Sequence, residues 1–274
     1  MIRAEILKLR TVTGTWIAVG IGAVGLLLTQ VLAVTFIPAL AAGAIEGADV
    51  GAELGGIDPG SLAFQAASLN PLGSAIGSTG SIGIASIVVM VLGLLVATTD
   101  YRFGGLVTTA LAQPRRLRIL GGKIGATTLA SAALAVLFVV ICLGTLLITT
   151  TVSPTVEFVV PVAQVLGIVA RSVAVIVLLA LLGLAIGVLV RSQLAGVLVV
   201  IALLILEPIV QSIVQLVTGG VPFWAQLLPL SLGQAAISDG SSGALPAVIA
   251  LPALGAIVLI VIAAAGAVLR RRDL

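Results

Sequence analysis

Histidine is absent from the 274 residues of this chain, and cysteine occurs once, as Cys142. The lack of histidine removes the most common general base and the most common metal ligand of proteins. A lone cysteine leaves no internal disulfide and no site built on paired thiolates. Aromatic residues make up only 3% of the chain, which is too few for the stacking platforms that bind single-stranded nucleic acid. We therefore expect neither a metal centre nor a nucleic-acid partner.

Charged residues are also scarce, at 8% of the chain, whereas hydrophobic residues reach 60%. Soluble domains usually carry about 25% charged residues. So few charges cannot cover a water-facing surface, and the composition therefore indicates a protein embedded in a lipid bilayer.

Six apolar segments are long enough to cross a membrane, since a helix needs about 20 such residues to span the hydrocarbon core. They lie at residues 14–42, 81–99, 124–151, 162–190, 194–217 and 245–269. We therefore predict an all-α polytopic membrane protein with six transmembrane helices, in which residues 1–274 form a single transmembrane domain.

The basic residues predict the orientation of these spans. With the N-terminus in the cytoplasm, every lysine and arginine except Arg171 falls toward the cytoplasmic side, as the positive-inside rule requires. An even number of crossings returns the basic C-terminus to the cytoplasm as well. A signal peptide would also begin with basic residues, but its apolar region is only about 7–15 residues long. The uncharged run after Arg10 is longer, so we expect the first span to be retained.

Residues 1–13 are predicted to form an interfacial elbow helix. Ile2, Ile6 and Leu9 recur at helical spacing, while Glu5 and Lys8 occupy other faces together with the arginines. Such a helix lies in the membrane interface with its apolar side toward the lipid. The same residues also serve as a positive-inside topology signal, and both roles are compatible.

Residues 218–244 alternate apolar pieces, such as Phe223-Trp224, with glycines. Non-helical backbone at membrane depth is tolerated only where protein or water covers it. Two interpretations stay open: a re-entrant hairpin, or an interfacial lid with Trp224 at the membrane surface.

Residues 20–25 match the pattern GxGxxG, but a dinucleotide site requires a βαβ unit around that motif, and these glycines lie inside a predicted span. We expect them, like Gly183 and Gly187, to permit close helix packing. The chain has no GxxxxGK(S/T) phosphate-binding loop, and no histidine to activate a serine in the turn at residues 240–243. We therefore predict that the chain is not an enzyme, and that any ATP is bound by another chain.

Residues 100–123 form the only sizeable cytoplasmic loop. Within it, Leu106, Val107, Ala110 and Leu111 make an apolar stripe that predicts a short helix over residues 103–113. Pro114 ends this helix, because proline disfavours helical backbone at the residue before it. The stripe either enters a groove of a partner or rests on the lipid surface while the arginines hold anionic headgroups.

The loop has a recognisable order of residue types: an acidic residue, an aromatic residue, glycine, a Leu-Ala-x-Pro segment, basic residues and a lysine. These are Asp100, Tyr101, Gly104, Leu111, Ala112, Pro114, Arg115, Arg116 and Lys123. With this order of residues the chain resembles the permease subunits of type-2 ABC exporters (the ABC-2 family). It also shares with them the amphipathic N-terminal helix, the six predicted spans and the basic C-terminus. Asp100 replaces the usual glutamate, and Gly105 the usual threonine.

The resemblance implies a membrane-spanning subunit that works with two cytosolic ABC ATPase subunits and a second permease, either another copy or a homologue. ATP and magnesium would be bound by the ATPases, and the 103–113 helix would couple them to the membrane domain. The implied coupling residues are Asp100, Tyr101, Phe103, Gly104, Leu106, Val107, Ala110, Leu111, Pro114, Arg115 and Arg116.

The expected cargo is amphipathic, such as a drug, an antimicrobial peptide or a lipid. The excess of arginine over lysine suggests a GC-rich genome, and hence the inner membrane of a bacterium. The alternative function is a secondary transporter or channel that needs no ATPase. Its expected mark, a series of charged residues deep in several spans, is missing apart from Glu207.

Ionisable residues within a span are candidates for function. Glu207, Gln211 and Gln215 follow one another at helical spacing and form one polar face of the fifth span. This face either lines the transport pathway or pairs with another helix, for example through Arg171. Arg171 would otherwise extend its charge to the outer interface.

Overall fold

The computed structural model describes residues 2–36, 38–39, 58–73, 83–102, 116–152, 156–238 and 245–271. Every regular element within these residues is helical, so the all-α prediction is confirmed for them. The elements are α1 (Ile2–Thr11), α2 (Thr13–Val31), the π-helix η1 (Leu32–Phe36), α5 (Leu62–Ser68), α6 (Ile84–Arg102), α8 (Arg116–Val152), α9 (Val162–Val190), α10 (Gln193–Thr218), α11 (Phe223–Gln226), α12 (Pro229–Ser238) and α13 (Ala247–Arg271).

Five of the described helices are long and apolar enough to cross a membrane. They cover Thr13–Phe36, Arg118–Val152, Val162–Val190, Gln193–Thr218 and Ala247–Leu269. The chain is therefore a multi-pass membrane protein. The apolar part of α6, Ile84–Asp100, is shorter than these five helices, so the predicted number of six spans depends on this helix.

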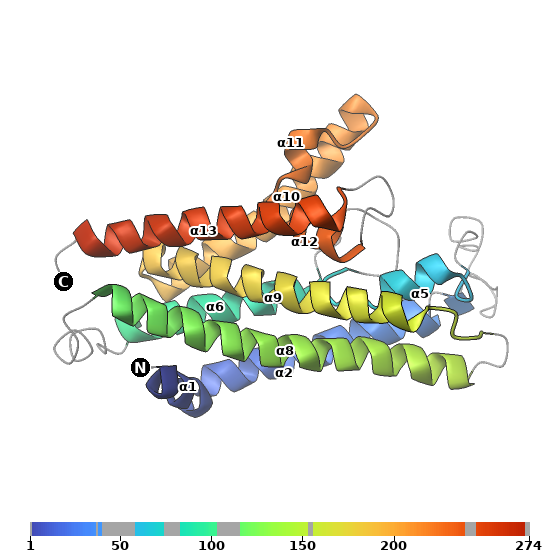
Figure 1. The fold of residues 1–274 in the computed structure, drawn as a ribbon, viewed down its shortest axis with the longest axis horizontal. Helices are drawn as coiled ribbons and strands as arrows, with labels where there is room; N and C mark the ends of the chain where they lie inside the picture. The colour runs from blue at the N-terminus through green and yellow to red at the C-terminus, as the bar shows by residue number, and fades with distance from the viewer. Residues whose placement is uncertain are drawn as a thin grey trace.

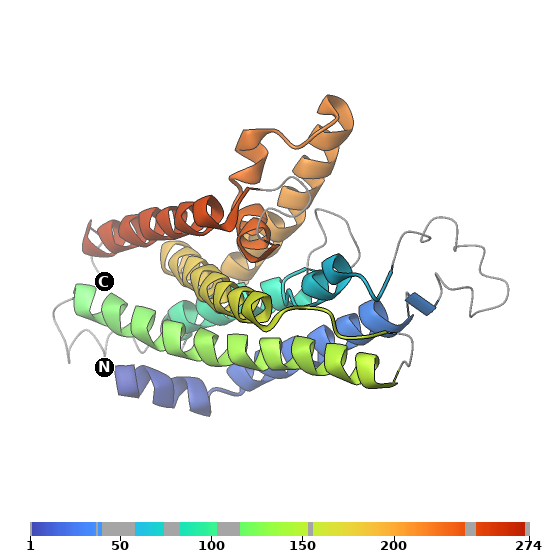
Figure 2. The same cartoon turned by 45° about the vertical axis from the view of Figure 1, so that its right-hand side comes forward.

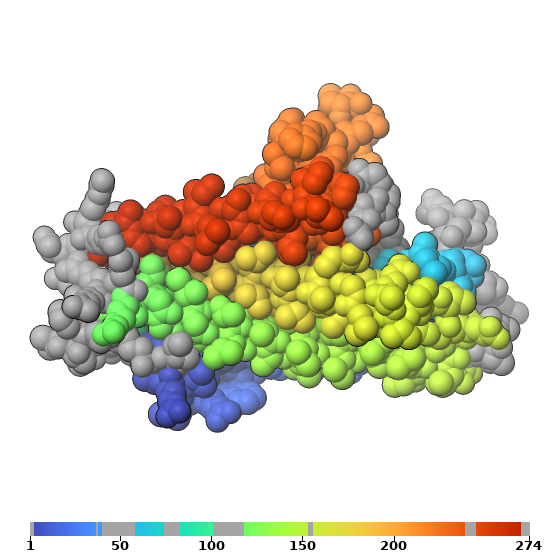
Figure 3. Space-filling model, viewed as in Figure 1, coloured from blue at the N-terminus to red at the C-terminus, as the bar shows by residue number. Residues whose placement is uncertain are grey.

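The helices lie roughly side by side in an elongated bundle (Figure 1). We call the end that holds α1 and the last turn of α13 the proximal end. The opposite end, where α8 ends and α9 begins, is the distal end. Figure 2 shows that the end of α10 and the short α11 project away from the bundle. On the face seen in Figure 3, α8, α9 and α13 lie next to one another.

The centre of the bundle is the pair α6 and α9, whose backbones approach closely at glycines. A Cβ atom at Gly93 would overlap the carbonyl group of Ala180, and one at Gly183 would overlap that of Met90. Contacts advance along both helices in the same direction, since Gly187 lies against Leu94. The two helices are therefore parallel, as the second and fourth spans of the predicted topology must be.

The glycines of the GxGxxG pattern also serve packing. A Cβ atom at Gly22 would lie 2.8 Å from a methyl carbon of Val88, and one at Gly25 the same distance from Ile84, both on α6. The prediction of close packing is confirmed for these two glycines and for Gly183 and Gly187. At Gly20 an added Cβ would meet nothing within 4 Å.

Two helix ends differ from the sequence interpretation. α8 begins at Arg116 and α6 continues to Arg102, so both ends of the predicted loop 100–123 are helical. Apolarity marks where a helix enters the membrane, but arginine and lysine are good helix formers and continue it into water. The predicted 103–113 helix lies outside the described residues.

Candidate functional site

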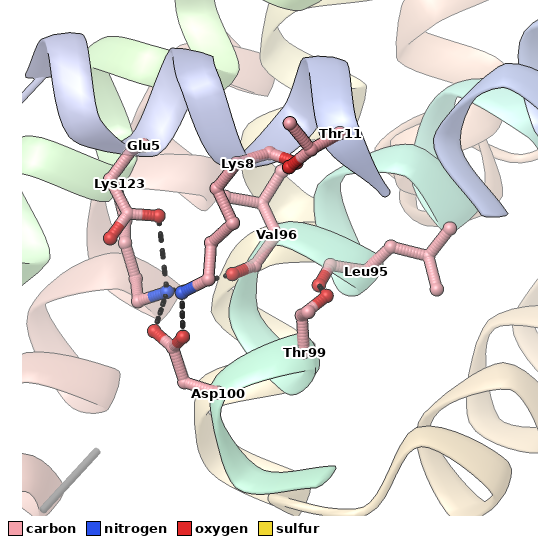
Figure 4. A network of polar contacts seen from close by, with 8 residues as sticks. All are labelled: Glu5, Lys8, Thr11, Leu95, Val96, Thr99, Asp100 and Lys123. Carbon is pink, nitrogen blue, oxygen red and sulfur yellow. Dashed lines mark hydrogen bonds and ion pairs between the residues drawn. The ribbon is translucent and has the colours of Figure 1, made fainter. Parts of the chain in front are cut away.

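Four charged side chains meet at the proximal end of the bundle: Glu5 and Lys8 from α1, Asp100 from α6, and Lys123 from α8 (Figure 4). We call this group the proximal charged cluster. Glu5 and Lys8 are three residues apart in α1 and therefore share one face of that helix. Asp100 lies near the end of α6 and Lys123 in the second turn of α8. The cluster thus joins three helices.

Asp100 is the centre of the cluster. One of its carboxylate oxygens, Oδ1, accepts a hydrogen bond from the Lys8 ammonium group, and the other, Oδ2, lies 2.5 Å from Nζ of Lys123. Lys123 Nζ also lies 3.6 Å from a carboxylate oxygen of Glu5 and donates a hydrogen bond of 2.8 Å to the carbonyl oxygen of Val96. The two lysines and two acids have no net charge between them.

The cluster is largely removed from solvent. The side chain of Asp100 is 1% exposed and that of Lys123 is 6% exposed, while Lys8 at 34% is the most open member. Burial lowers the pKa of Lys8 below its ordinary value; the neighbouring Glu5 raises this pKa, and Lys123 lowers it. A buried ion pair is costly to desolvate, and it becomes strongly destabilising once one partner is removed. These contacts therefore oblige the three helices to stay together.

The sequence places Glu5 and Lys8 on other faces of α1 than its apolar residues, and the structure shows that both kinds of residue contribute to the buried side of this helix. Glu5, Ile6, Lys8 and Leu9 are the partly buried residues, whereas Arg3, Leu7 and Arg10 are exposed. The reason is that α1 packs its Glu5 and Lys8 face against the bundle, where Asp100 and Lys123 compensate the charges. Its arginines stay free to face water or lipid headgroups.

The cluster brackets the predicted coupling segment. Asp100 precedes it and Lys123 follows it, so both ends of the connection between α6 and α8 are fixed to α1 and to each other. Among the other predicted coupling residues, Tyr101 lies in the last turn of α6 and Arg116 opens α8. The remainder lie outside the described residues: Phe103, Gly104, Leu106, Val107, Ala110, Leu111, Pro114 and Arg115.

A second polar group lies inside the bundle, between α10 and α12. The Glu207 carboxylate accepts hydrogen bonds from the backbone N–H groups of Leu230 and Ser231, at 3.1 and 2.6 Å, and from the Ser231 hydroxyl at 2.7 Å. The amide of Gln211 donates to the Ser231 hydroxyl and to the carbonyl oxygen of Ala225. Because the free N–H groups at a helix N-terminus attract negative charge, Glu207 acts as a cap for α12 from a neighbouring helix.

The hydrogen bonds described for this group do not include the other two intramembrane candidates, Gln215 and Arg171. Gln215 is exposed near the end of α10, and Arg171 is partly buried in α9. All the hydrogen bonds described for the Glu207 carboxylate run to α12. A role of Arg171, Glu207, Gln211 and Gln215 in a transport pathway, or of Arg171 as the partner of Glu207, stays a prediction.

Sequence reasoning named Asp100 and Lys123 but did not assign Glu5 and Lys8 to a site. The sequence does contain one signal for them: the predicted cytoplasmic side is strongly basic, and Glu5 and Asp100 are among its few acidic residues. Acids that occur among many basic residues are candidates for ion pairs. Ser231, the partner of Glu207, carries no comparable signal, because serine is common in loops.

Within the described residues, no group of three or more cysteine, aspartate and glutamate side chains is arranged to hold a metal ion. The chain matches no model of a known protein family and no curated protein.

Proposed function

We propose that this chain is the permease subunit of an ATP-driven ABC-2 exporter, which forms the path for an amphipathic substrate and is coupled to a separate cytosolic ATPase through residues 103–113. The observation that carries the proposal is the proximal charged cluster. It fastens the elbow helix α1 to both ends of the predicted coupling segment, at Asp100 and Lys123. A force applied to that segment therefore reaches α6, α8 and α1 together.

In this proposal α6 is the second span along the chain and brings the number of crossings to six. It is shorter than the other five, but it lies at the centre of the bundle with Ala85, Val89, Met90 and Leu94 fully buried. It also runs parallel to α9, as an even-numbered span does. The proximal end, which carries α1 and the last turn of α13, is then cytoplasmic together with both termini.

The proposed assembly contains two permeases and two ATPases in the inner membrane of a bacterium. ATP and magnesium are bound by the ATPases. Their closure moves the 103–113 helix, and the proximal charged cluster transmits this movement as a rigid-body rotation of whole helices. Membrane lipids surround the apolar faces, and the exposed Arg3 and Arg10 of α1 suit contact with anionic headgroups.

The test is reconstitution with an ATPase that carries Walker motifs and is encoded next to this chain. We expect the two proteins to co-purify in detergent, and ATP turnover to rise when the permease is present. Leu106→Asp and Leu111→Asp should leave membrane insertion intact but abolish the stimulated turnover, because a charge cannot enter an apolar groove without a large desolvation cost.

Gly220→Asp is the matched control, since Gly220 is exposed between α10 and α11 and an added Cβ there meets nothing within 4 Å, so turnover should stay normal. Normal co-purification and turnover of both leucine variants would remove the coupling role of residues 103–113. Transport by the purified permease alone, without any ATPase, would instead favour the secondary transporter or channel.

A further inference from the structure

The distal end of the bundle is filled by a segment that does not itself span the membrane. Residues 58–73 consist of a turn, the short helix α5 and an irregular stretch. Five consecutive residues of this segment, 68–72, are buried, as are Phe64 and Gln65 of α5. Such complete burial is unusual for a connection, because loops ordinarily run over the protein surface.

Three glutamine side chains from separate elements hold the segment in place. Gln65 is itself fully buried; its amide donates to the carbonyl oxygen of Glu157 at 2.7 Å and its carbonyl accepts from Val159 N–H at 3.0 Å. Gln30 of α2 donates to the carbonyl oxygen of Ser68 at 3.0 Å. Gln234 of α12 donates to the carbonyl oxygen of Leu72 at 3.4 Å. The segment is thus anchored by side-chain hydrogen bonds rather than by a continuous backbone ladder.

The irregular stretch at residues 69–73, which follows α5, lies against the N-terminal end of α6. A Cβ atom at Gly83 would be only 2.6 Å from the carbonyl oxygen of Leu72, and the Leu72 side chain is fully buried. On its other side, Leu72 lies 3.9 Å from the position of a Cβ atom at Gly233 in α12. Leu72 therefore fills the space between α6 and α12.

We propose that residues 58–73 form a plug that closes the distal end of the permease's transport path next to the start of α6, and that the plug withdraws from α6 and α12 when substrate is released. This inference rests on the proposed function. Its physical basis is the mode of anchoring: the segment is held by a few side-chain hydrogen bonds and by the buried side chains of Phe64, Leu69 and Leu72, and these contacts can part without unfolding the helices that provide them. A helix that spans the membrane cannot detach locally from its neighbours in this way.

Thiol labelling tests whether the plug opens. In a Cys142→Ser background, which removes the sole native thiol, Ser68→Cys places a nearly isosteric thiol at a fully buried position. The neighbouring Ala67→Cys lies at an exposed position and is the matched control. The probe is a membrane-impermeant maleimide, applied to the complex with its ATPase with no nucleotide, with ATP, and with ATP and vanadate.

We expect the Ala67→Cys variant to react in every state. The Ser68→Cys variant should react slowly without nucleotide and about tenfold faster or more in one state of the ATP cycle, because the labelling rate follows the population of the open state. Equal, slow labelling of the Ser68→Cys variant in all states, in a complex with normal ATP turnover, would overturn the plug. A complex without stimulated ATP turnover would instead overturn the proposed function.

Crosslinking provides a second measurement that does not depend on Ser68. A Cβ atom at Gly73 would lie 3.3 Å from the amide oxygen of Gln234, so Gly73→Cys with Gln234→Cys suits a short bifunctional thiol reagent. If the plug must move, the crosslink should reduce ATP turnover roughly tenfold, because a fixed plug blocks the change of packing on which each cycle depends. For each single variant, turnover should be the same before and after treatment with the reagent. Unchanged turnover of the crosslinked complex would show a static cap and overturn the inference.

Discussion

Asp100 is the most deeply buried charged residue of the proximal charged cluster. Its carboxylate is almost fully buried and contacts two ammonium groups, those of Lys8 and Lys123. Neither lysine has a second acid at comparable distance, since the Glu5 oxygen is 3.6 Å from Lys123. The stability of this end of the protein therefore depends on one carboxylate.

Asp100→Asn should destabilise the protein by about 3–5 kcal/mol, because it leaves two like charges close together and poorly compensated in a buried site. Thermal unfolding of the purified protein in detergent measures the effect as a lower Tm. Asp58→Asn, at an exposed carboxylate, is the control and should leave the Tm unchanged. Adding Lys123→Met to Asp100→Asn should recover part of the loss, and a Tm unaffected by Asp100→Asn would contradict the structural role of the cluster.

At this scale the sequence indicates candidate residues but not their partners. Asp100 and Lys123 stand out because they flank the amphipathic loop, whereas Glu5 and Lys8 look like part of a topology signal. Lys8 and Asp100 are 92 positions apart in the chain. Local periodicity carries no information about such a distance, because it depends on how helices pack.

Among the elements, the α6 and α9 pair is held by glycines that face backbone rather than side chains. At Gly93 the facing atoms are the carbonyl group of Ala180 and the amide nitrogen of Leu184. A flexible side chain can rotate away from an added methyl group, but a helix backbone cannot move without shifting the whole element. This interface therefore tolerates no larger residue.

Gly93→Ala should force α6 and α9 apart and cost about 1–3 kcal/mol or more, as overpacking of a core does. Gly144→Ala in α8 is the matched control, because an added Cβ there meets nothing within 4 Å; it should be neutral or slightly stabilising. Size-exclusion profiles and thermal unfolding in detergent compare the two variants. Equal behaviour of both would show that the two helices pack less closely than described.

The ends of a helix can be predicted from the sequence where particular residues stop it. α9 occupies residues 162–190, as predicted, because Pro161 precedes it and the left-handed backbone of Arg191 ends it. α8 begins before the predicted span 124–151, since its first turns are polar but still helical. The burial of residues 58–73 could not be foreseen, because their glycine, serine and alanine content resembles that of an exposed loop.

The whole molecule has both described chain ends at one end of the bundle (Figure 1). Five helices of spanning length would leave these ends on opposite sides of a membrane, whereas a sixth crossing by α6 brings them to the same side. The parallel packing of α6 and α9 supports the second arrangement. The described part of the chain thus makes a definite prediction about topology.

Single cysteines in a Cys142→Ser background test this prediction in intact cells with an impermeant maleimide. Asp58→Cys, at the distal end, should be labelled from outside. Arg3→Cys and Leu274→Cys should react only after permeabilisation, because six crossings leave both termini in the cytoplasm. Labelling of only one of these two terminal variants in intact cells would show that α6 does not cross.

α8 is a continuous helix of 37 residues, about 55 Å long at about 1.5 Å per residue. It exceeds the hydrocarbon thickness of about 30 Å, and it joins the end that holds Lys123 to the end that contacts α5. A rotation of this helix by about 5° about one end displaces the other end by about 5 Å. In the proposed exporter, a small movement that the ATPase imposes on the basic end of α8 would thus become a displacement at the other end larger than the length of a hydrogen bond.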